Sequence, residues 1–162
     1  LGSMDEWLEN LDLIVTVERL KPQNMPRAIQ LLNKTNQVNL RARRLTQVEY
    51  ECWIEVATRS AWTITVCDRF GNLGLVGLLS VETEGVTADV VDFVLSCRAM
   101  GRKVEEVMIY CLTEHARSMH LKQLTMNFVR TTRNAPLDKI LRATAMIHDS
   151  ENEIYYWNIR IN

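Results

Sequence analysis

The sequence lacks any long apolar run and any strong imbalance of charge. No apolar stretch approaches the roughly 18 residues needed to cross a bilayer. Lysine and arginine total 19 against 20 acidic residues, which gives a net charge of −1. A protein that binds nucleic acid without regard to sequence normally carries a strongly basic surface. We therefore expect neither a membrane nor a nucleic-acid partner.

Cysteine and histidine are also scarce, and neither forms a pattern typical of metal ligands. The four cysteines, Cys52, Cys67, Cys97 and Cys111, have no Cys-x-x-Cys spacing and lie in apolar segments. We interpret them as reduced, buried thiols, which favours a cytoplasmic location. The three histidines are too scattered to suggest a metal site. The sequence therefore predicts no bound metal.

What is present is the composition of one globular domain. The chain has 162 residues, of which 47% are apolar and 24% are charged, enough for a substantial core. Residues 1–4 resemble a cloning remnant, because Leu1-Gly2-Ser3 precedes a methionine. We place a single domain at residues 5–162, since no repeat or interdomain linker interrupts it.

Apolar periodicity predicts strands and helices in mixed order. Strands are expected at 11–17, 62–67, 75–81, 86–97, 121–128 and 154–161, and helices at 26–32, 46–57, 101–119 and 134–143. The polar segment 33–39 is expected to interrupt the helices. The three middle strands form an antiparallel meander, joined by a turn at 68–74 that Asp68 is expected to shape. This order indicates an α/β (α+β) sheet covered by helices on both faces.

Three cations lie within six residues where the longest helix is expected to begin. Arg98, Arg102 and Lys103 flank Gly101, although a helix N-terminus already carries partial positive charge. Unpaired N–H groups at a helix start bind anions, most often phosphate, and a glycine lets the backbone approach closely. The segment is therefore either a phosphate site or a solvated basic turn, partly neutralised by the two glutamates that follow.

This arrangement resembles the acyl-CoA loop of the GNAT acyltransferase superfamily. That loop reads Arg or Gln, two residues, Gly, one residue, then Gly or Ala, and it precedes the longest helix. The sequence supplies Arg98 and Gly101, with Lys103 in the last place. The resemblance implies a mixed, mostly antiparallel sheet. It also implies that CoA or a phosphopantetheine thioester contacts Leu95, Ser96, Arg98, Gly101, Arg102, Lys103, Val104 and Asn134.

A closer resemblance is to the C-terminal, GNAT-like half of FkbH-like proteins. It rests on four motifs, at 34–40 with Arg43-Arg44, at 68–77, at 96–102 and at 132–136. Those proteins fuse a HAD-type phosphatase-like half to the GNAT-like half. They move a glyceryl group onto an acyl carrier protein in polyketide biosynthesis. The resemblance implies a carrier protein as partner, together with a HAD-like domain in cis or in trans.

Two motifs of these families are missing or altered. The HAD half needs an Asp-x-Asp-x-Thr motif, which the chain lacks, so we expect no phosphatase-type chemistry. Many GNAT enzymes protonate the leaving thiolate with a tyrosine seven residues after an asparagine. Asn134 fits the asparagine, but Leu141 holds the tyrosine place and cannot donate a proton. Either another residue acts as the acid or the domain binds a thioester without transferring its acyl group.

Two residues of the expected strand 86–97 are candidates for catalysis. Cys97 is a possible nucleophile, because Arg98 and the helix start would stabilise its thiolate; alternatively it points into the sheet. Ser96 and Cys97 face opposite sides of the strand, so only one can face a pocket. Asp92, on the side of Ser96, is either a base or a solvated carboxylate.

Three amides precede the second helix. In GNAT folds this segment borders the acceptor site, so Asn36, Gln37 and Asn39 are candidate substrate contacts. Amides can donate and accept hydrogen bonds around a polar acyl or hydroxyacyl group. The alternative is that they only cap and turn the chain.

Three functional hypotheses follow. The first is an acyltransferase-type domain that binds CoA or a carrier-protein phosphopantetheine thioester during biosynthesis of a polyketide extender unit. The second is a non-catalytic docking module, to which a basic patch steers an acidic carrier protein. That patch would comprise Arg98, Arg102, Lys103, Arg130 and Arg133. The third is a small-amine N-acetyltransferase.

Overall fold

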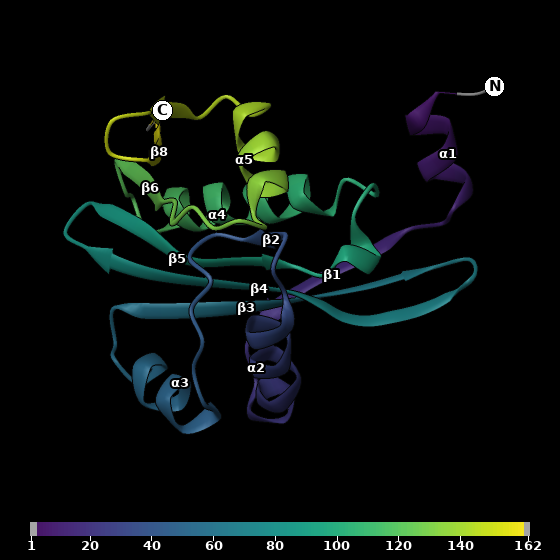
Figure 1. Cartoon of the computed structure of the whole chain (residues 1–162), viewed down its shortest axis with the longest axis horizontal. Coiled ribbons are helices and arrows are strands. Elements are labelled where there is room, and N and C mark those ends of the chain that lie inside the picture. The colour runs from purple at the N-terminus through teal and green to yellow at the C-terminus, as the bar shows by residue number, and fades with distance from the viewer. Residues whose placement is uncertain (1–2, 161–162) are drawn as a thin grey trace.

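A computed structural model describes residues 3–160, which form an eight-stranded sheet with helices on both faces (Figure 1). The strands are β1 (Ile14–Arg19), β2 (Val38–Asn39), β3 (Arg59–Asp68), β4 (Gly71–Glu84), β5 (Thr87–Leu95), β6 (Gln123–Asn127), β7 (Ile147–Asp149) and β8 (Ile154–Asn158). The α-helices are α1 (Met4–Asn10), α2 (Met25–Lys34), α3 (Gln47–Ile54), α4 (Val104–Ser118) and α5 (Ala135–Arg142). Short 3₁₀ turns, η1 (Pro22–Asn24) and η2 (Cys97–Ala99), precede α2 and follow β5.

The sheet is mixed and mostly antiparallel, which confirms the expected fold class. Its strand order is β1-β3-β4-β5-β6-β8-β7. Strands β3, β4 and β5 form the expected antiparallel meander. Among the strands of residues 3–160, only β5 and β6 pair in parallel, and α4 supplies the crossover that a parallel pair requires. No helix of residues 3–160 is long and apolar enough to span a bilayer.

Two apolar cores lie on opposite faces of the sheet. Neighbouring residues of one strand enter different cores, because successive side chains of a strand point to opposite faces. Leu79 and Phe93 pack under α4 and α5, whereas Leu78 and Val94 pack against α2 and α3. Figure 1 shows these helix pairs above and below the sheet. The apolar runs of the central strands are therefore explained by burial on both sides.

Strand β2 fills a gap between two diverging strands. Strands β5 and β6 pair only from Thr87–Val90 to residues 123–126 and then separate. Into this gap β2 inserts antiparallel to the end of β5. Leu40 next accepts a hydrogen bond from the amide of Val129 at 3.0 Å and donates its own to Phe93 at 3.1 Å. Residues 38–40 thus bridge β5 to the segment after β6.

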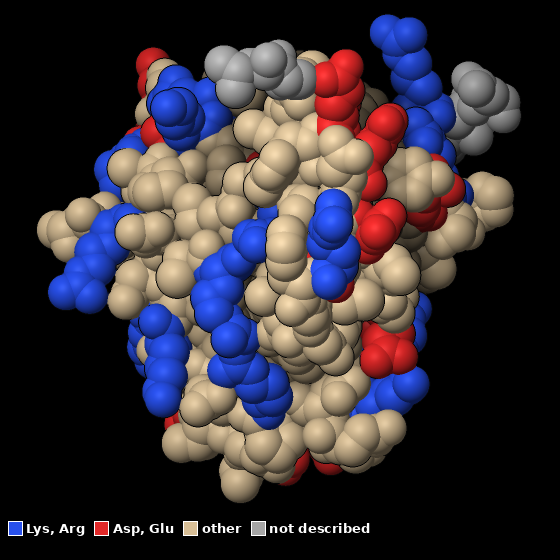
Figure 2. All heavy atoms as spheres, turned by 90° about the vertical axis from the view of Figure 1, so that its right-hand side faces the viewer, with Lys and Arg blue, Asp and Glu red and all other residues tan. Residues whose placement is uncertain are grey.

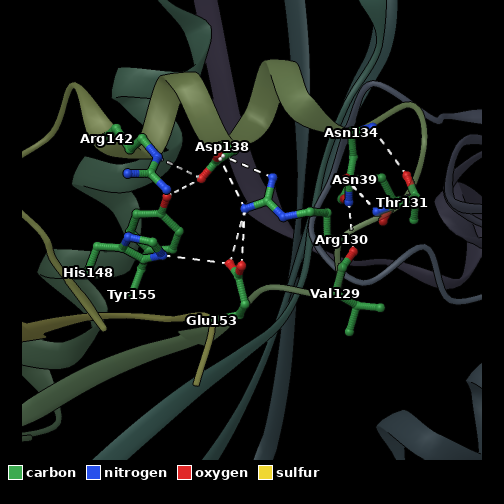
Figure 3. Close-up of polar contacts among 10 residues, drawn as sticks. All are labelled: Asn39, Val129, Arg130, Thr131, Asn134, Asp138, Arg142, His148, Glu153 and Tyr155. Atoms are coloured by element: carbon green, nitrogen blue, oxygen red, sulfur yellow. Dashed lines mark hydrogen bonds and ion pairs between the residues drawn. The ribbon is translucent and has the colours of Figure 1, made fainter. Parts of the chain in front are cut away.

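The side chain of Asn134 also forms hydrogen bonds that hold β2 in place (Figure 3). Its fully buried Nδ2 donates to the carbonyls of Asn39 at 3.1 Å and Val129 at 2.8 Å. Its Oδ1 accepts from the amide of Thr131 at 2.9 Å. One side chain therefore ties β2, the segment after β6 and the start of α5 together.

Helix α5 is also attached to β8 through a polar cluster (Figure 3). The Asp138 carboxylate accepts a hydrogen bond from the buried Tyr155 hydroxyl and pairs with Arg142 at 3.2 Å. Arg130 bridges Asp138 and Glu153, at 3.4 and 3.1 Å. Burial works against the Asp138 carboxylate, but the hydrogen bonds from Tyr155 and Arg142 outweigh it and lower the pKa of Asp138. The cluster orients α5 over the sheet.

Most expected elements are confirmed, and three small ones were missed. Helix α1 was missed because its start was interpreted as a cloning remnant; Ser3 and Glu6 nevertheless form a capping box, a pattern visible in the sequence. Strand β2 was missed because it has two residues inside a polar stretch. Strand β7 has only three. Residues 1–2 of the supposed remnant and residue 161 of the last expected strand lie outside the described residues.

Several expected boundaries were wrong. The hairpin turn expected at 68–74 comprises only Arg69 and Phe70, because β3 ends at Asp68 and β4 begins at Gly71. Two further boundaries were wrong because non-glycine residues adopt left-handed backbone. Asp12 has φ = 50°, so β1 begins at Ile14 rather than at residue 11. Gly101 and Lys103 have φ of 78° and 56°, and α4 begins only at Val104. Left-handed backbone is rare outside glycine, asparagine and aspartate, so a lysine there gives no sequence signal.

The expectation about the cysteines was wrong in part. All four are free thiols, but Cys52 and Cys97 are exposed and Cys67 and Cys111 are half-buried. Cys52 lies on the outer side of α3, and Cys97 begins the turn η2, where the chain leaves the core. Apolar neighbours in sequence therefore did not predict burial at these positions.

The junction at β2 is expected to carry a measurable share of stability. Replacing Asn134 with alanine leaves buried carbonyls and an amide without partners, which costs about 1–3 kcal/mol. Urea unfolding followed by circular dichroism should show this loss, whereas Gln37→Ala, at an exposed position, should change stability by less than about 0.5 kcal/mol. Equal effects of the two substitutions would contradict the role given to Asn134.

Candidate functional site

A pocket of about 320 Å³ lies where α2 and β5 both end. Its walls come from α2, from the segment that follows α2, and from the end of β5. The lining residues are Arg27, Leu31, Lys34, Thr35, Asn36, Gln37, Leu95, Ser96 and Cys97. Asn36 and Gln37 were expected at an acceptor site, and Leu95, Ser96 and Cys97 at a thioester site. The fold brings these two groups, about 60 residues apart in sequence, into one pocket.

The loop from 96 to 103 begins at this pocket. The Ser96 hydroxyl accepts a weak hydrogen bond from the amide of Arg98 at 3.4 Å and so starts η2. The Arg98 guanidinium donates to the carbonyl of Leu73 at 2.7 Å. Arg102 in turn donates to the carbonyl of Arg98 at 2.7 Å. The two arginines thus brace the loop against the β3–β4 hairpin while remaining partly exposed.

Acidic side chains from other elements partly neutralise the loop. Arg102 lies 3.7 Å from the Asp68 carboxylate, and Lys103 lies 2.6 Å from that of Asp5 on α1. Hydrogen bonding to Asp5, together with its charge, raises the pKa of Lys103. Asp68 also accepts from the amide of Phe70, as its expected turn role requires. Exposed ion pairs contribute little, so a phosphate can replace Asp5 as the partner of Lys103.

Helix α4 begins without a side-chain cap, as α2 and α5 also do. Ser3 and Thr46 cap α1 and α3 through complete capping boxes. In contrast, Lys103 stands at the cap position of α4, and its ammonium group cannot accept a hydrogen bond from a first-turn amide. First-turn amides of a helix have no intrahelical acceptor. These amides, with Gly101 beside them, are suited to an anionic ligand.

Basic side chains gather at this end of the molecule. The end carries the tip of the β3–β4 hairpin and the loop before α4, on the right in Figure 1. Figure 2 shows lysine and arginine side chains spread over this face, with acidic ones mostly to one side. The chain as a whole is nearly neutral, so the basic character is local.

Arg44 holds the pocket wall at the end of α2. Its guanidinium donates to the carbonyls of Leu32 at 2.5 Å and Thr35 at 3.3 Å, and to the side-chain oxygen of Asn36 at 2.8 Å. A cation is favourable at a helix C-terminus, where orphan carbonyls point outward. Arg44 therefore fixes the Asn36 amide at the pocket.

The sequence left Asp92 as either a base or a solvated carboxylate, and the structure rules out the solvated carboxylate. The side chain is fully buried and forms a two-bond ion pair with Arg43, with N···O distances of 2.9 and 2.5 Å. The Arg43 guanidinium also stacks on the Trp53 ring, 4.7 Å from its centroid. A carboxylate held in this way is committed to structure, so the geometry gives no support to Asp92 as a general base.

Three further candidate residues lie behind the pocket rather than in it. Val104 and Asn134 are fully buried, Asn134 at the β2 junction. Asn39 is also fully buried: it donates to the carbonyls of Leu32 and Thr35 and accepts from the amide of Ala42. Asn39 therefore caps and turns the chain, as one of the two alternatives expected. Of the three candidate amides, Asn36 and Gln37 line the pocket and Asn39 does not.

The position where a tyrosine acid was expected faces the core. Leu141 is fully buried under α5. A tyrosine does lie near α5, Tyr155 on β8, but its hydroxyl is bonded to Asp138. Burial, together with that hydrogen bond, raises the pKa of Tyr155. Neither residue supplies a proton to the pocket.

Two cations of the pocket were missed from the sequence. Arg27 and Lys34 line the pocket wall formed by α2. Although the helix expected at 26–32 ended before Lys34, the two residues are seven apart on α2, a spacing that is visible in the sequence and places both on one helical face. The sequence therefore held the signal that they share a face, although not that this face meets the end of β5.

Comparisons with known proteins identify the fold. No protein-family model and no curated protein sequence matches the chain. The solved structure of the ribosomal-protein-S18-alanine N-acetyltransferase from Escherichia coli matches with a TM-score of 0.65 at 9% identity, over 92% of this chain and 96% of that one. Spermidine N-acetyltransferase from Vibrio cholerae, in complex with CoA and spermine, matches with a TM-score of 0.64 at 10% identity, over 90% and 95%.

A domain from Methanocaldococcus jannaschii matches with a TM-score of 0.66 at 14% identity, over 91% of this chain and 99% of that one. These likenesses show that the chain has the GNAT acetyltransferase fold, as the resemblance of its loop implied. At such low identity the similarity extends to the fold alone.

The buried pair beside the pocket predicts a large effect on stability. Arg43→Ala leaves the Asp92 carboxylate buried without its partner, which costs about 3–5 kcal/mol. Lys21→Ala, which removes an exposed ion pair with Glu18, should cost less than about 1 kcal/mol. Denaturant midpoints of both variants measure the difference. A cost for Arg43→Ala as small as that of the control would contradict the pairing.

Proposed function

We propose that this GNAT-fold domain binds a phosphopantetheine thioester, carried by CoA or by an acyl carrier protein, in polyketide extender-unit biosynthesis. One observation carries the proposal: the pocket at the ends of α2 and β5 adjoins the uncapped start of α4. A phosphate and a short acyl group of one ligand can therefore be held at adjacent positions. The FkbH-like resemblance supplies the chemical identity of the acyl group, a glyceryl or hydroxyacyl unit.

The loop accounts for the phosphate. Amides at the start of α4 point toward a bound anion, and Arg102 and Lys103 add charge-assisted hydrogen bonds. Lys103 now pairs with the exposed carboxylate of Asp5, which a phosphate can replace. Such a ligand would also satisfy the helix end that no side chain caps.

The pocket accounts for the thioester and its acyl group. Leu31 and Leu95 supply apolar wall, while Asn36 and Gln37 supply amides for hydroxyl or carbonyl oxygens. Cys97 exposes its thiol at the same pocket. If acyl transfer occurs here, Cys97 is the nucleophile that the geometry favours, because its side chain is exposed and lines the pocket.

Binding of a phosphate-bearing thioester is directly measurable. Calorimetry with CoA, with an acyl-CoA and with a holo carrier protein should detect association for at least one of them. Arg98→Ala and Arg102→Ala should each weaken it by about tenfold or more, because a hydrogen bond to a charged group contributes about 1.5–3 kcal/mol. Lys122→Ala, at an exposed position away from the loop, serves as control. Absence of heat with all three ligands would refute the proposal.

A second candidate function is favoured by the missing proton donor. Leu141 is buried and the Tyr155 hydroxyl donates to Asp138, so neither position provides the usual tyrosine acid at the pocket. If no acyl group is transferred, the domain is a docking module that holds a carrier protein and its prosthetic arm for a HAD-like partner. The basic end shown in Figure 2 would steer an acidic carrier protein to the pocket.

Thioester turnover separates these functions. An acylated carrier protein incubated with the domain, with spermidine and with a free thiol is weighed by mass spectrometry. A docking module leaves the acyl group in place at the rate of the buffer control, and Leu141→Tyr does not change this, because position 141 faces the core. Acyl loss that requires Cys97 would support transfer, and loss that requires only the amine would support an amine acetyltransferase.

A further inference from the structure

Strand β1 is an exposed sheet edge without the usual protective features. It pairs with β3 in unbroken register from Ile14 to Arg19, and within residues 3–160 no strand lies on its other side. Proteins normally protect such edges with proline, lysine, bulges or very short strands. Here the six residues Ile-Val-Thr-Val-Glu-Arg contain no proline, lysine or bulge. The two charged residues of the strand, Glu18 and Arg19, both lie at its C-terminal end, whereas Ile14 at the other end is 60% exposed.

The opposite edge of the sheet shows the contrast. Strand β7 ends the sheet on that side with only three residues, one of them charged. A short edge offers few unpaired N–H and C=O groups to another chain. The two edges therefore differ in their capacity to accept a further strand.

An apolar groove of about 620 Å³ runs beside β1. Val15 and Val17 form one wall, and α4 forms the other through Val107 and Tyr110, of which Tyr110 is 64% exposed. His115 closes the groove against Trp62, with ring centroids 4.6 Å apart. Burial and the nearby charge of Arg19 lower the pKa of His115. A partner that covers the groove at neutral pH therefore buries a neutral imidazole rather than a charged one.

We propose that β1 is the interface of a homodimer, in which the β1 strands of two copies pair antiparallel about a two-fold axis perpendicular to the sheet. The joined sheet would be continuous across the axis. Rotation about such an axis does not turn the sheet over, so the same face of the sheet points the same way in both copies. The valines at 15 and 17 of both copies therefore lie on the face that carries α4, and the two grooves merge into one apolar layer between two α4 helices.

Antiparallel pairing of two β1 strands brings no like charges together. Side chains that oppose each other across this axis have the same parity, so the axis passes at Thr16 or at Val17. In the first register Glu18 lies opposite Ile14, and in the second it lies opposite Thr16. Arg19 correspondingly lies opposite residue 13 or Val15. No like charges meet in either register, and directly opposed like charges would destabilise the pair.

A second copy fits this edge better than an unrelated extended segment. The groove supplies apolar contact only to side chains that alternate apolar on one face, and β1 itself has this pattern at Val15 and Val17. Two-fold homodimers are also the commonest closed assemblies. Pairing of two edges satisfies both rows of unpaired backbone groups at once.

Sedimentation velocity over a range of concentrations tests the proposal, with matched substitutions on the two edges. The intact chain should sediment as a dimer. Ile14→Asp places a carboxylate opposite or diagonal to the partner's Glu18 in either register, and should weaken dimerisation by about tenfold or more. Ile147→Asp makes the same change at a 49% exposed isoleucine on β7 and should leave the dimer intact.

Both substitutions lie at exposed positions, and circular dichroism confirms that each variant is folded. Hydrogen exchange supplies an independent readout: amides of β1 should exchange more slowly at concentrations that favour the dimer, while those of β7 should not change. A monomer at every concentration, or equal loss of the dimer in both variants, overturns the proposal. A dimer whose β1 amides exchange as fast as in the monomer also overturns it.

Discussion

The backbone pairing of residues 38–40 is the constraint on which the rest of the structure depends. Strands β5 and β6 are parallel over four residue pairs and then diverge, which would leave buried N–H and C=O groups unpaired. Residues 38–40 satisfy these groups on both sides of the gap. The candidate pocket lies beside this closed gap, where α2 and β5 end.

Much of the fold could be predicted because its main elements have strong local signals. The alternation in β3, β4 and β5 and the capping box at Thr46 specify strands and a helix without tertiary context. Strand β2 has no such signal: Val38 and Asn39 form a strand only because Val94 and Leu95 lie beside them. The late start of α4 likewise depends on a lysine held in left-handed backbone, which propensity disfavours.

The candidate site was predictable in part for the same reason. The loop motif located Arg98, Gly101 and the cations, because spacing along one chain segment is visible in a sequence. Whether a polar side chain faces a pocket or the interior depends on its distant neighbours. Asp92 illustrates this dependence: its role is decided by Arg43, 49 residues earlier. The sequence suggested Asn39 and Asn134 as ligand contacts, but the side-chain amide of each forms hydrogen bonds with backbone groups of the protein.

The hydrogen bond from Asn134 to the carbonyl of Asn39 also has a consequence for the order of folding. It joins residues 95 positions apart, and contacts of such long sequence separation form late, because closing the loop between them costs chain entropy. Strand β2 cannot reach its final place until β5, β6 and the start of α5 exist. The meander of β3, β4 and β5 can form earlier from local contacts, so the pocket is completed in the last steps of folding.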